Sequence, residues 1–166
     1  MQVEELAELR RRVHRLGIPV AADESVRKAD DPLAVARAGA ADLLVVKLQP
    51  LGGISRARTI IREAGLPVVV SSALETSVGI AMSATFAASL EVLEFDCGLG
   101  TAALLAGDVT AEPLVPIEGM LPVRAVVPDL DLLDRFAAAP DRVTWWRDRI
   151  ARCHAVLARR ADSLSA

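Results

Sequence analysis

Apolar residues recur along residues 3–16 at the spacing of one helix face. The residues on this stripe are Val3, Leu6, Leu9, Val13 and Leu16. Gly17 and Pro19 come directly afterwards, and both residue types are common just beyond the end of a helix. The pattern therefore predicts an amphipathic helix at the start of the chain.

Short apolar runs then alternate with helical segments. Four runs are predicted to be strands, because each is short, rich in Val, Leu or Ile, and bounded by Gly, Pro or charged residues. They cover residues 18–22, 43–46, 68–70 and 92–95. The runs are continuous rather than alternating, which is typical of parallel strands that are buried on both faces.

Helices are predicted between these strands. Asp31 is a candidate N-cap residue and Pro32 fits the first helical position, so one helix should run from there to about Gly39. Two more helices are predicted over 55–64 and 75–90. The strand starts recur about every 25 residues, which is the period of a (β/α) barrel or a doubly wound sheet.

The pattern changes after Gly107. Four prolines fall within residues 113–128, where apolar residues alternate with polar ones. This composition predicts an extended excursion rather than another strand–helix repeat. A hairpin turn is expected at Glu118-Gly119, because glycine favours the left-handed backbone of tight turns.

Two helices are predicted at the end of the chain, a short one over 129–138 and a longer one over 141–160. One face of the longer helix carries Val143, Trp146, Ile150, Cys153 and Leu157. The chain is thus expected to divide into an α/β unit over residues 1–112 and a C-terminal extension over residues 113–166.

Composition narrows the class of protein. The 166 residues are 52% hydrophobic and 25% charged with a net charge of −3, too mild and too scattered for a nucleic-acid binder. No apolar run approaches the roughly 18 residues of a membrane span, and the first residues lack a signal-peptide pattern. The two cysteines, Cys97 and Cys153, are far apart in sequence and form no metal-binding pair. A cytoplasmic protein that binds neither nucleic acid nor membrane is expected.

Polar side chains follow the first two predicted strands. Asp23 and Glu24 come after the first strand and Lys47 after the second. Parallel strands place their carboxyl ends on one rim, where ligands bind. The carboxylates suit Mg²⁺, and a partly desolvated lysine suits proton abstraction or enolate stabilisation. The alternatives without a catalytic role are that the carboxylates cap a loop and that the lysine side chain extends to solvent.

The later strands also end in small or polar residues. Ser71 and Ser72 follow the third strand and are candidates for binding an anion, with ordinary helix capping as the alternative. Gly52-Gly53 either admits a ligand or makes a turn. Gly98 and Gly100 follow the fourth strand, but they are too few for a dinucleotide fingerprint. Four such endings on one rim are harder to explain by coincidence than any one alone.

These motifs together resemble a known family. Ala-Ala-Asp-Glu-Ser at 21–25, Val-Val-Lys-Leu-Gln-Pro-Leu-Gly-Gly at 45–53 and Val-Ser-Ser-Ala-Leu-Glu-Thr-Ser-Val-Gly at 70–79 are similar to the latter half of an o-succinylbenzoate synthase of the enolase superfamily. The match continues through Cys-Gly-Leu-Gly-Thr at 97–101 and Pro-Leu-Val-Pro at 113–116. The resemblance implies a partial (β/α) barrel, about the last four strands of a (β/α)₇β barrel, with a C-terminal extended and helical segment.

The resemblance also implies roles for single residues. Asp23 corresponds to a metal carboxylate, helped more weakly by Glu24, and Lys47 to a catalytic lysine. Ser71, Ser72 and Gly98 lie near the substrate. The implied reaction, in menaquinone synthesis, is the Mg²⁺-dependent dehydration of 2-succinyl-6-hydroxy-2,4-cyclohexadiene-1-carboxylate, a small carboxylate, to 2-succinylbenzoate.

The chain also departs from the family pattern. Two further metal carboxylates, a Lys-x-Lys strand and most of a capping domain have no counterpart in it. We therefore expect association with the missing N-terminal half, or self-association through open sheet edges. The alternatives are a truncated half-barrel without catalytic activity and a fragment of a related N-acylamino acid racemase or muconate cycloisomerase.

Overall fold

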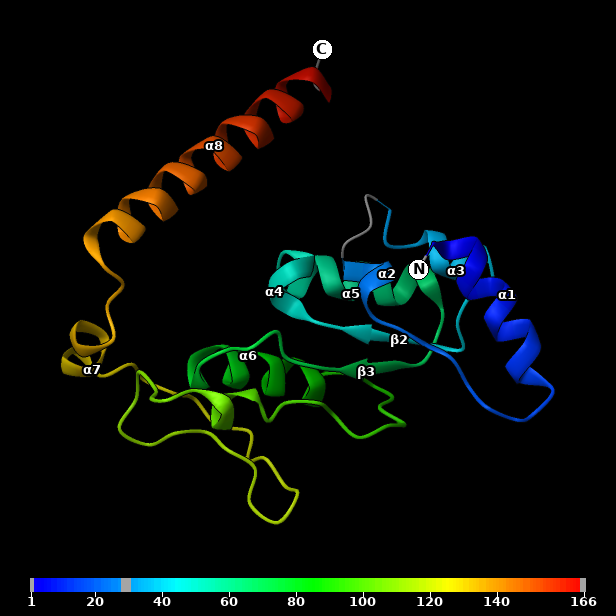
Figure 1. Cartoon of the computed structure of the whole chain (residues 1–166), viewed down its shortest axis with the longest axis horizontal. Helices are drawn as coiled ribbons and strands as arrows, with labels where there is room; N and C mark the ends of the chain where they lie inside the picture. Colours follow the sequence, from blue (N-terminus) through cyan, green and yellow to red (C-terminus); the bar gives the residue numbers. More distant parts are fainter. Residues whose placement is uncertain (1, 28–30, 165–166) are drawn as a thin grey trace.

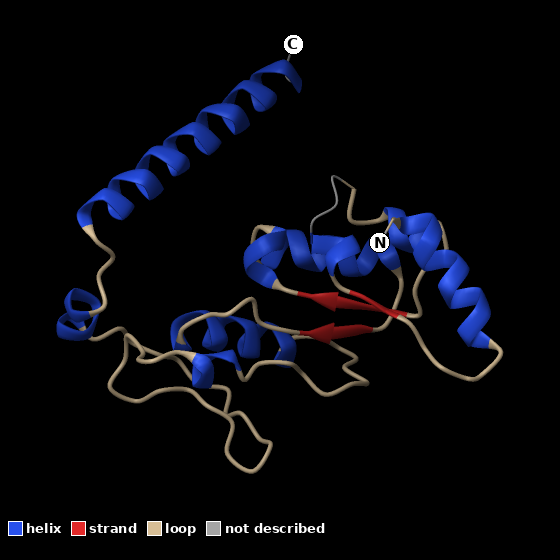
Figure 2. Cartoon of the chain, in the orientation of Figure 1, coloured by secondary structure: helices blue, strands red, loops and turns tan. Residues whose placement is uncertain are grey.

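The computed structural model describes residues 2–27 and 31–164, and it shows an α/β fold around a small parallel sheet. The strands are β1 (Ala21–Ala22), β2 (Leu43–Val46) and β3 (Val68–Val70), in the spatial order β1-β2-β3 (Figures 1 and 2). Both pairings are parallel. The predicted α/β class and the first three strands are therefore confirmed, although β1 is shorter than expected.

Helices connect and cover these strands. Their bounds are α1 (Val3–His14), α2 (Glu24–Arg27), α3 (Ala34–Arg37), α4 (Leu48–Leu51), α5 (Ile54–Ala64), α6 (Ser77–Ala88), α7 (Leu130–Arg135) and α8 (Pro140–Leu164), with a 3₁₀ turn at Thr101–Leu104. The helices predicted at the start of the chain, between β2 and β3, and after β3 are confirmed. The one-turn helices α2 and α4 directly after β1 and β2 were not predicted. Within the described ranges, no helix has the length and apolarity needed to cross a bilayer.

The core lies against one face of the sheet. Leu44 and Val46 of β2 and Val70 of β3 are fully buried. Phe86 of α6 is 1% exposed and belongs to the same apolar cluster. On the opposite face, Val45 of β2 and Val69 of β3 are only partly buried, so within the described chain the apolar runs are fully covered on one side of the sheet.

One carboxylate, that of Asp42, determines where strand pairing begins. Asp42, just before β2, accepts hydrogen bonds from the Arg10 guanidinium at 2.6 and 2.9 Å and from the Val20 backbone N–H at 2.8 Å. The Arg10 contact, followed by the Val20 contact, lowers the pKa of Asp42. Because Val20 bonds to this side chain and Pro19 has no N–H, regular pairing starts only at Ala21.

The predicted start of the second helix, at Asp31, is wrong. Asp31 accepts a hydrogen bond from Leu33 N–H at 3.0 Å, which makes a local turn over Pro32, and α3 begins only at Ala34. An aspartate that bonds the amide two residues ahead competes with helix formation at that point. Asp30, which precedes this turn in the sequence, lies outside the described residues.

The fourth strand predicted over 92–95 is also wrong. This segment is irregular, and Val92 is 66% exposed. Glu94 interrupts this run, and Glu91 and Asp96 flank it, so burying the segment between two layers would bring unpaired charges with it. The chain reaches β3 only at an isolated parallel bridge between Ser71 and Gly98.

The chain after α6 is tied back to the body by a second carboxylate. Asp108 accepts hydrogen bonds from the backbone N–H and the hydroxyl of Ser77, the first residue of α6. The Ser77 hydroxyl in turn accepts from Leu114 N–H at 2.6 Å. Ser77 is fully buried and Leu114 is 1% exposed, so this segment is part of the core.

The expected turn at Glu118-Gly119 is confirmed. Ile117 and Met120 exchange two backbone hydrogen bonds of 2.9 Å, and both turn residues have positive φ. The two C-terminal helices are confirmed as α7 and α8. The long helix α8 stands away from the sheet (Figure 1).

Candidate functional site

Three side chains occupy equivalent places on the sheet. Asp23, Lys47 and Ser71 are each the first residue after the end of a strand. Because the strands are parallel and adjacent, these residues share one rim. The backbone aligns Lys47 with Ser71, since Ser71 N–H donates to Val46 O at 2.9 Å, whereas the register places Asp23 level with Val45.

Lys47 and Asp23 are in direct contact. Lys47 Nζ donates to Asp23 Oδ2 at 2.6 Å, a charge-assisted hydrogen bond between the ends of neighbouring strands. The lysine side chain is 15% exposed and the aspartate 27%. The sequence therefore placed this carboxylate and this lysine correctly on one rim, and the structure adds their direct contact.

The carboxylates of this rim do not make a metal site by themselves. Glu24 opens α2 and is exposed, whereas Asp23 faces Lys47. No grouping of three or more His, Cys, Asp or Glu residues suited to a metal ion occurs in the described ranges. Mg²⁺ prefers about six oxygen ligands, several of them water, on carboxylates whose charge is free to neutralise it. The chain therefore offers Asp23, next to a lysine, as one ligand of such a site and not the whole site.

The serines of the rim are used to join two segments. The Ser71 and Ser72 hydroxyls donate to Gly98 O at 3.2 and 3.0 Å, and Ser72 N–H donates to the same oxygen at 3.0 Å. Ser72 is 5% exposed. A side chain at Gly98 would come within 2.9 Å of Ser71 Oγ, so the close approach requires glycine or a shift of that serine.

Two residues beside this joint were not singled out from the sequence. Thr101 Oγ1 donates to Ser72 Oγ at 2.8 Å and accepts from Glu75 N–H at 3.3 Å. A continuous hydrogen-bonded chain thus runs from Gly98 O through two hydroxyls to the backbone N–H of Glu75, two residues before α6. The cue in the sequence was Thr101 itself, which follows the Gly-Leu-Gly motif.

Glu75 is the second missed residue. Its side chain is 5% exposed, Oε1 has no hydrogen-bond partner among the described residues, and Oε2 is 3.5 Å from Ser83 Oγ. Burial raises the pKa of this carboxyl. A Cβ at Gly79 would come within 2.9 Å of the Glu75 side chain, so this side chain packs where only a glycine leaves room for it. The glycine four residues after Glu75 was therefore the signal in the sequence that could have identified this residue. Leu74, with φ of 65°, turns the chain so that Glu75 points inward.

The two remaining sequence candidates have structural explanations. Gly52 ends α4 with φ of 92°, and Gly53 precedes α5 with φ of 103°, so the pair makes the turn between two helices. Cys97 lies just before the Gly98 joint, and burial raises the pKa of its thiol, which keeps it a weak nucleophile.

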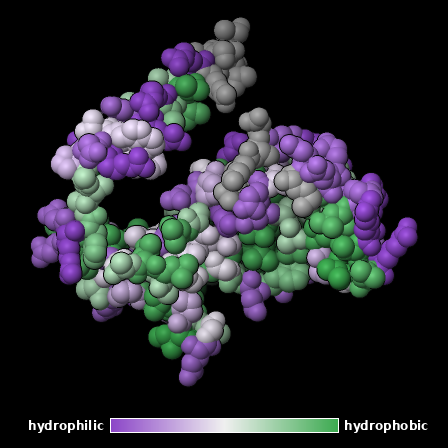
Figure 3. All heavy atoms as spheres, viewed as in Figure 1, coloured by the Kyte–Doolittle hydropathy of each residue, from purple (hydrophilic) through white to green (hydrophobic). Residues whose placement is uncertain are grey.

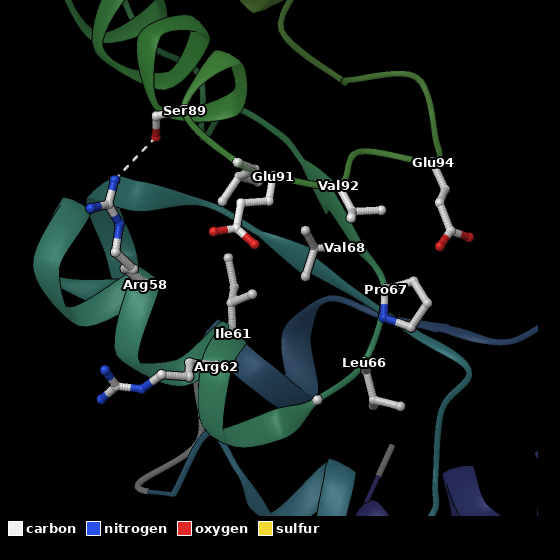
Figure 4. Close-up of a pocket in the computed structure, with 12 residues that line it drawn as sticks. Arg58, Ile61, Arg62, Leu66, Pro67, Val68, Ser89, Glu91, Val92 and Glu94 are labelled. Atoms are coloured by element: carbon white, nitrogen blue, oxygen red, sulfur yellow. Dashed lines mark hydrogen bonds between the residues drawn. The ribbon is translucent and has the colours of Figure 1, made fainter.

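A cavity of about 690 Å³ lies at the other end of the sheet. It opens between α5 and residues 89–94, as Figure 4 shows, where Arg58 donates to Ser89 Oγ at 3.2 Å. Its wall includes Pro67 and Val68, where β3 begins. The cavity forms where the predicted fourth strand is absent, and it does not touch the rim residues.

Known proteins resemble this chain in sequence. The model of the enolase C-terminal domain-like family matches residues 1–129. The o-succinylbenzoate synthase of Mycobacterium marinum is 52% identical over 159 residues, which is 96% of this chain and 47% of that protein. The enzyme of the same name from Mycobacterium tuberculosis is 53% identical over 155 residues, which is 93% and 46% of the two proteins. The chain therefore spans about half the length of the relatives it matches.

Solved structures share its fold. 2-Chloromuconate cycloisomerase from Rhodococcus opacus superimposes with a TM-score of 0.70 at 33% identity, over 82% of this chain and 38% of that one. Muconate lactonizing enzyme from Pseudomonas putida gives 0.67 at 26% identity, over 80% and 38%. The resemblance to o-succinylbenzoate synthases drawn from the motifs is confirmed. This chain belongs to the enolase C-terminal domain-like family.

Proposed function

We propose that this chain supplies the C-terminal part of an o-succinylbenzoate synthase active site. The observation that carries the proposal is the 2.6 Å contact between Lys47 Nζ and Asp23 Oδ2 on one rim. It occurs in a chain that is 52% identical to a protein of that name. The reaction would be the dehydration of 2-succinyl-6-hydroxy-2,4-cyclohexadiene-1-carboxylate to 2-succinylbenzoate, a step of menaquinone synthesis.

Lys47 would act through its charge. The substrate loses the proton next to its carboxylate and then its hydroxyl group, so negative charge builds on the carboxylate before water leaves. An ammonium group held on the rim by Asp23 stabilises this charge without having to reorganise. The low exposure of Lys47 strengthens that interaction, because little water competes with it.

Ser71, Ser72 and Gly98 would shape the substrate-binding rim. Both hydroxyls donate to Gly98 O, so their support for the proposal is the rigid joint that they build. The succinyl group would lie against this joint rather than bond to the buried Ser72 hydroxyl. Lys47, which follows the neighbouring strand, would face the reacting end of the same molecule.

Mg²⁺ would be bound only when further carboxylates join Asp23. The chain has one rim carboxylate in position, with Glu24 as a weaker second, and we derive no step through the metal from these two residues. The remaining ligands and a second lysine would come from a segment equivalent to the other half of the relatives. In this proposal, the three strands are part of a larger (β/α) barrel that this segment completes.

The proposal includes how the two parts meet. The outer edge of β1 would pair with a strand of that segment, and residues 113–166 would form an extension that packs on a capping domain. The two free thiols, Cys97 and Cys153, are compatible with a cytoplasmic location.

The test is to mix this chain with a separately produced N-terminal half, taken from the matching region of the Mycobacterium marinum relative. Dehydration is followed by the absorbance of the aromatic product, with and without Mg²⁺. We expect activity only in the mixture with Mg²⁺. Lys47→Ala should lower the rate by about 10²–10³-fold, as loss of a group that stabilises developing charge does elsewhere.

A control variant separates chemistry from assembly. Arg62→Ala changes an exposed cation far from the rim and should leave the rate of the mixture unchanged. Full activity of the Lys47→Ala mixture would exclude the proposed role of Lys47. Because the solved relatives include muconate lactonizing enzymes, a muconate assay runs beside the main one, and turnover of muconate alone would reassign the substrate.

A further inference from the structure

Helix α8 carries an apolar stripe that the described chain leaves largely uncovered, since every stripe residue except the partly buried Val143 is exposed. We define the seam as the residues that recur three and four positions apart, namely Val143, Trp146, Ile150, Cys153 and Leu157. Trp146 is 47% exposed, Ile150 65% and Leu157 64%. In Figure 3 the helix stands clear of the remaining side chains. A seam of this spacing is what one helix presents to another in a coiled coil.

The side chains that border the seam are basic. Arg142 and Arg149 precede seam residues on one side, and Arg147 and His154 lie on the other. Across the whole helix, six arginines and three aspartates give a formal charge of +3, whereas the complete chain carries −3, so the remainder carries −6. The border positions of a coiled coil select its partner by charge.

The two tryptophans reinforce one border. Their ring centroids are 4.8 Å apart, and the Arg142 guanidinium lies 4.3 Å from the centroid of Trp145. Arg149 lies 5.6 Å from the same ring on the next turn. Cation–π contacts of this kind hold the guanidinium groups along the helix instead of leaving them to spread into solvent.

We infer that the seam of α8 is the docking surface for a helix that has an apolar stripe bordered by acidic side chains. The seam from Val143 to Leu157 is about 21 Å long, which corresponds to about four helical turns. The interface would pair arginine borders with carboxylates over a buried seam. This inference rests on the docking role proposed for residues 113–166, but not on the proposed reaction.

A second copy of this chain does not fit the seam. Two α8 helices would place Arg142, Arg149 and Arg147 against one another in either orientation, which repels. Helix α1 carries three glutamates balanced by three arginines, and its Leu6 and Ala7 are already buried in the body. Helix α7 has six residues, less than half the length of the seam. The partner helix therefore belongs to a different segment of protein.

A lipid surface is also a poorer fit. Helices that lie in a membrane interface bury a wide apolar face, whereas the five seam residues lie within about 80° of the helix circumference. Trp145 lies outside this stripe and is held beside Arg142 instead. A narrow stripe with ordered charges on its borders favours a helix as the occupant.

The experiment uses the full chain and the fluorescence of Trp145 and Trp146, which are its only tryptophans. The probes are a 21-residue peptide with leucine or isoleucine at seam positions and glutamate at the borders, a matched peptide with lysine at the borders, and vesicles of phosphatidylglycerol and phosphatidylcholine. We expect a saturable blue shift with the acidic peptide only.

Variants locate the contact. Ile150→Asp should weaken binding of the acidic peptide by about tenfold or more, because it buries a charge in the seam. The double variant Arg142→Glu with Arg149→Glu should also weaken it by about tenfold. The matched control, Arg152→Glu with Arg159→Glu, makes the same change of charge on the opposite face and should stay within about twofold. Far-UV circular dichroism checks that each variant keeps its helix content.

Four results would overturn the inference. They are equal binding of the lysine peptide, a shift with vesicles but not with the acidic peptide, a dimer in sedimentation that Ile150→Asp dissociates, and no binding to any probe. Restored dehydration in the mixing experiment together with any of these would leave the proposed function standing. Binding of the acidic peptide without restored dehydration would support the inference about α8 and contradict the proposed function.

Discussion

The rim of the sheet and helix α8 are two parts of the chain built from equally clear patterns. At the rim, Asp23 and Lys47 each follow a strand, and their partly buried side chains contact each other directly. On α8, an apolar seam of good spacing lies open, with Leu157 64% exposed. The same sequence rules were satisfied in both places, but only at the rim does the described chain provide the surface against which the pattern folds.

This difference shows that a hydrophobic pattern predicts local structure more securely than it predicts burial. A strand becomes a strand only beside a neighbour, so β2 and β3 confirm both their pattern and their packing. A long helix closes its own backbone hydrogen bonds and forms whether or not its apolar face is covered. An exposed seam therefore points to a surface that lies elsewhere.

The largest expected effect comes from truncating one leucine in each region. Leu44→Ala removes a fully buried side chain from β2 and should lower the free energy of unfolding by about 3 kcal/mol, because it leaves a cavity. Leu157→Ala on α8 should change it by less than about 0.5 kcal/mol. Urea unfolding followed by circular dichroism measures both, and similar losses for the two variants would show that α8 packs on the body.

A smaller effect is expected at Asp108, which ties the segment after α6 back to the body of the chain. Asp108→Ala leaves the first amide of α6 and the buried Ser77 hydroxyl without their acceptor, and should cost about 2 kcal/mol of unfolding free energy. Asp108→Asn keeps an acceptor oxygen and should cost less than half as much. Equal stability of wild type and Asp108→Ala in urea would mean that the segment after α6 is not anchored there.

The smallest expected effect depends on pH. Burial raises the pKa of Glu75, so the folded chain keeps this carboxyl protonated at pH values where the unfolded chain has already ionised it. The free energy of unfolding should therefore fall as pH rises from the ordinary glutamate range through the raised pKa. Glu75→Gln removes this titration and should be the more stable form above that window.

Urea titrations of wild type and Glu75→Gln at a series of pH values, from about pH 4 to about pH 8, test this sign. The difference between the two proteins should be smallest in acid and should grow with pH. A constant difference across the series would show that the carboxyl is ionised in the folded state, for instance through a partner cation. Glu63→Gln, at an exposed position of α5, serves as the control for loss of a glutamate charge.

The rim could be predicted because short-range pattern and strand polarity are sufficient to place strand ends together. The contact of Lys47 with Asp23 follows from two apolar runs and a parallel connection. The joint at Gly98 could not be predicted in the same way, because its hydrogen bonds connect Ser72 to Thr101 across 29 residues of sequence. Contacts of that kind depend on tertiary packing, which no local pattern records.

The two wrong predictions, the strand over 92–95 and the helix start at Asp31, also have definite physical causes. Residues 92–95 have strand-like residue types, but Glu91, Glu94 and Asp96 make their burial between two layers too costly. Asp31 was predicted to cap a helix, but its side chain accepts a hydrogen bond from Leu33 N–H in a local turn, and the helix begins only at Ala34. In both places a polar side chain, rather than the apolar pattern, decided the backbone.

The most direct test of the function is the rate of dehydration when this chain is mixed with an N-terminal half of an o-succinylbenzoate synthase. We predict Mg²⁺-dependent formation of 2-succinylbenzoate in the mixture, and a loss of about 10²–10³-fold when Lys47→Ala replaces the wild-type chain. A mixture that assembles, as shown by sedimentation, yet forms the product equally fast with Lys47→Ala would contradict the assignment of this rim as half of the active site.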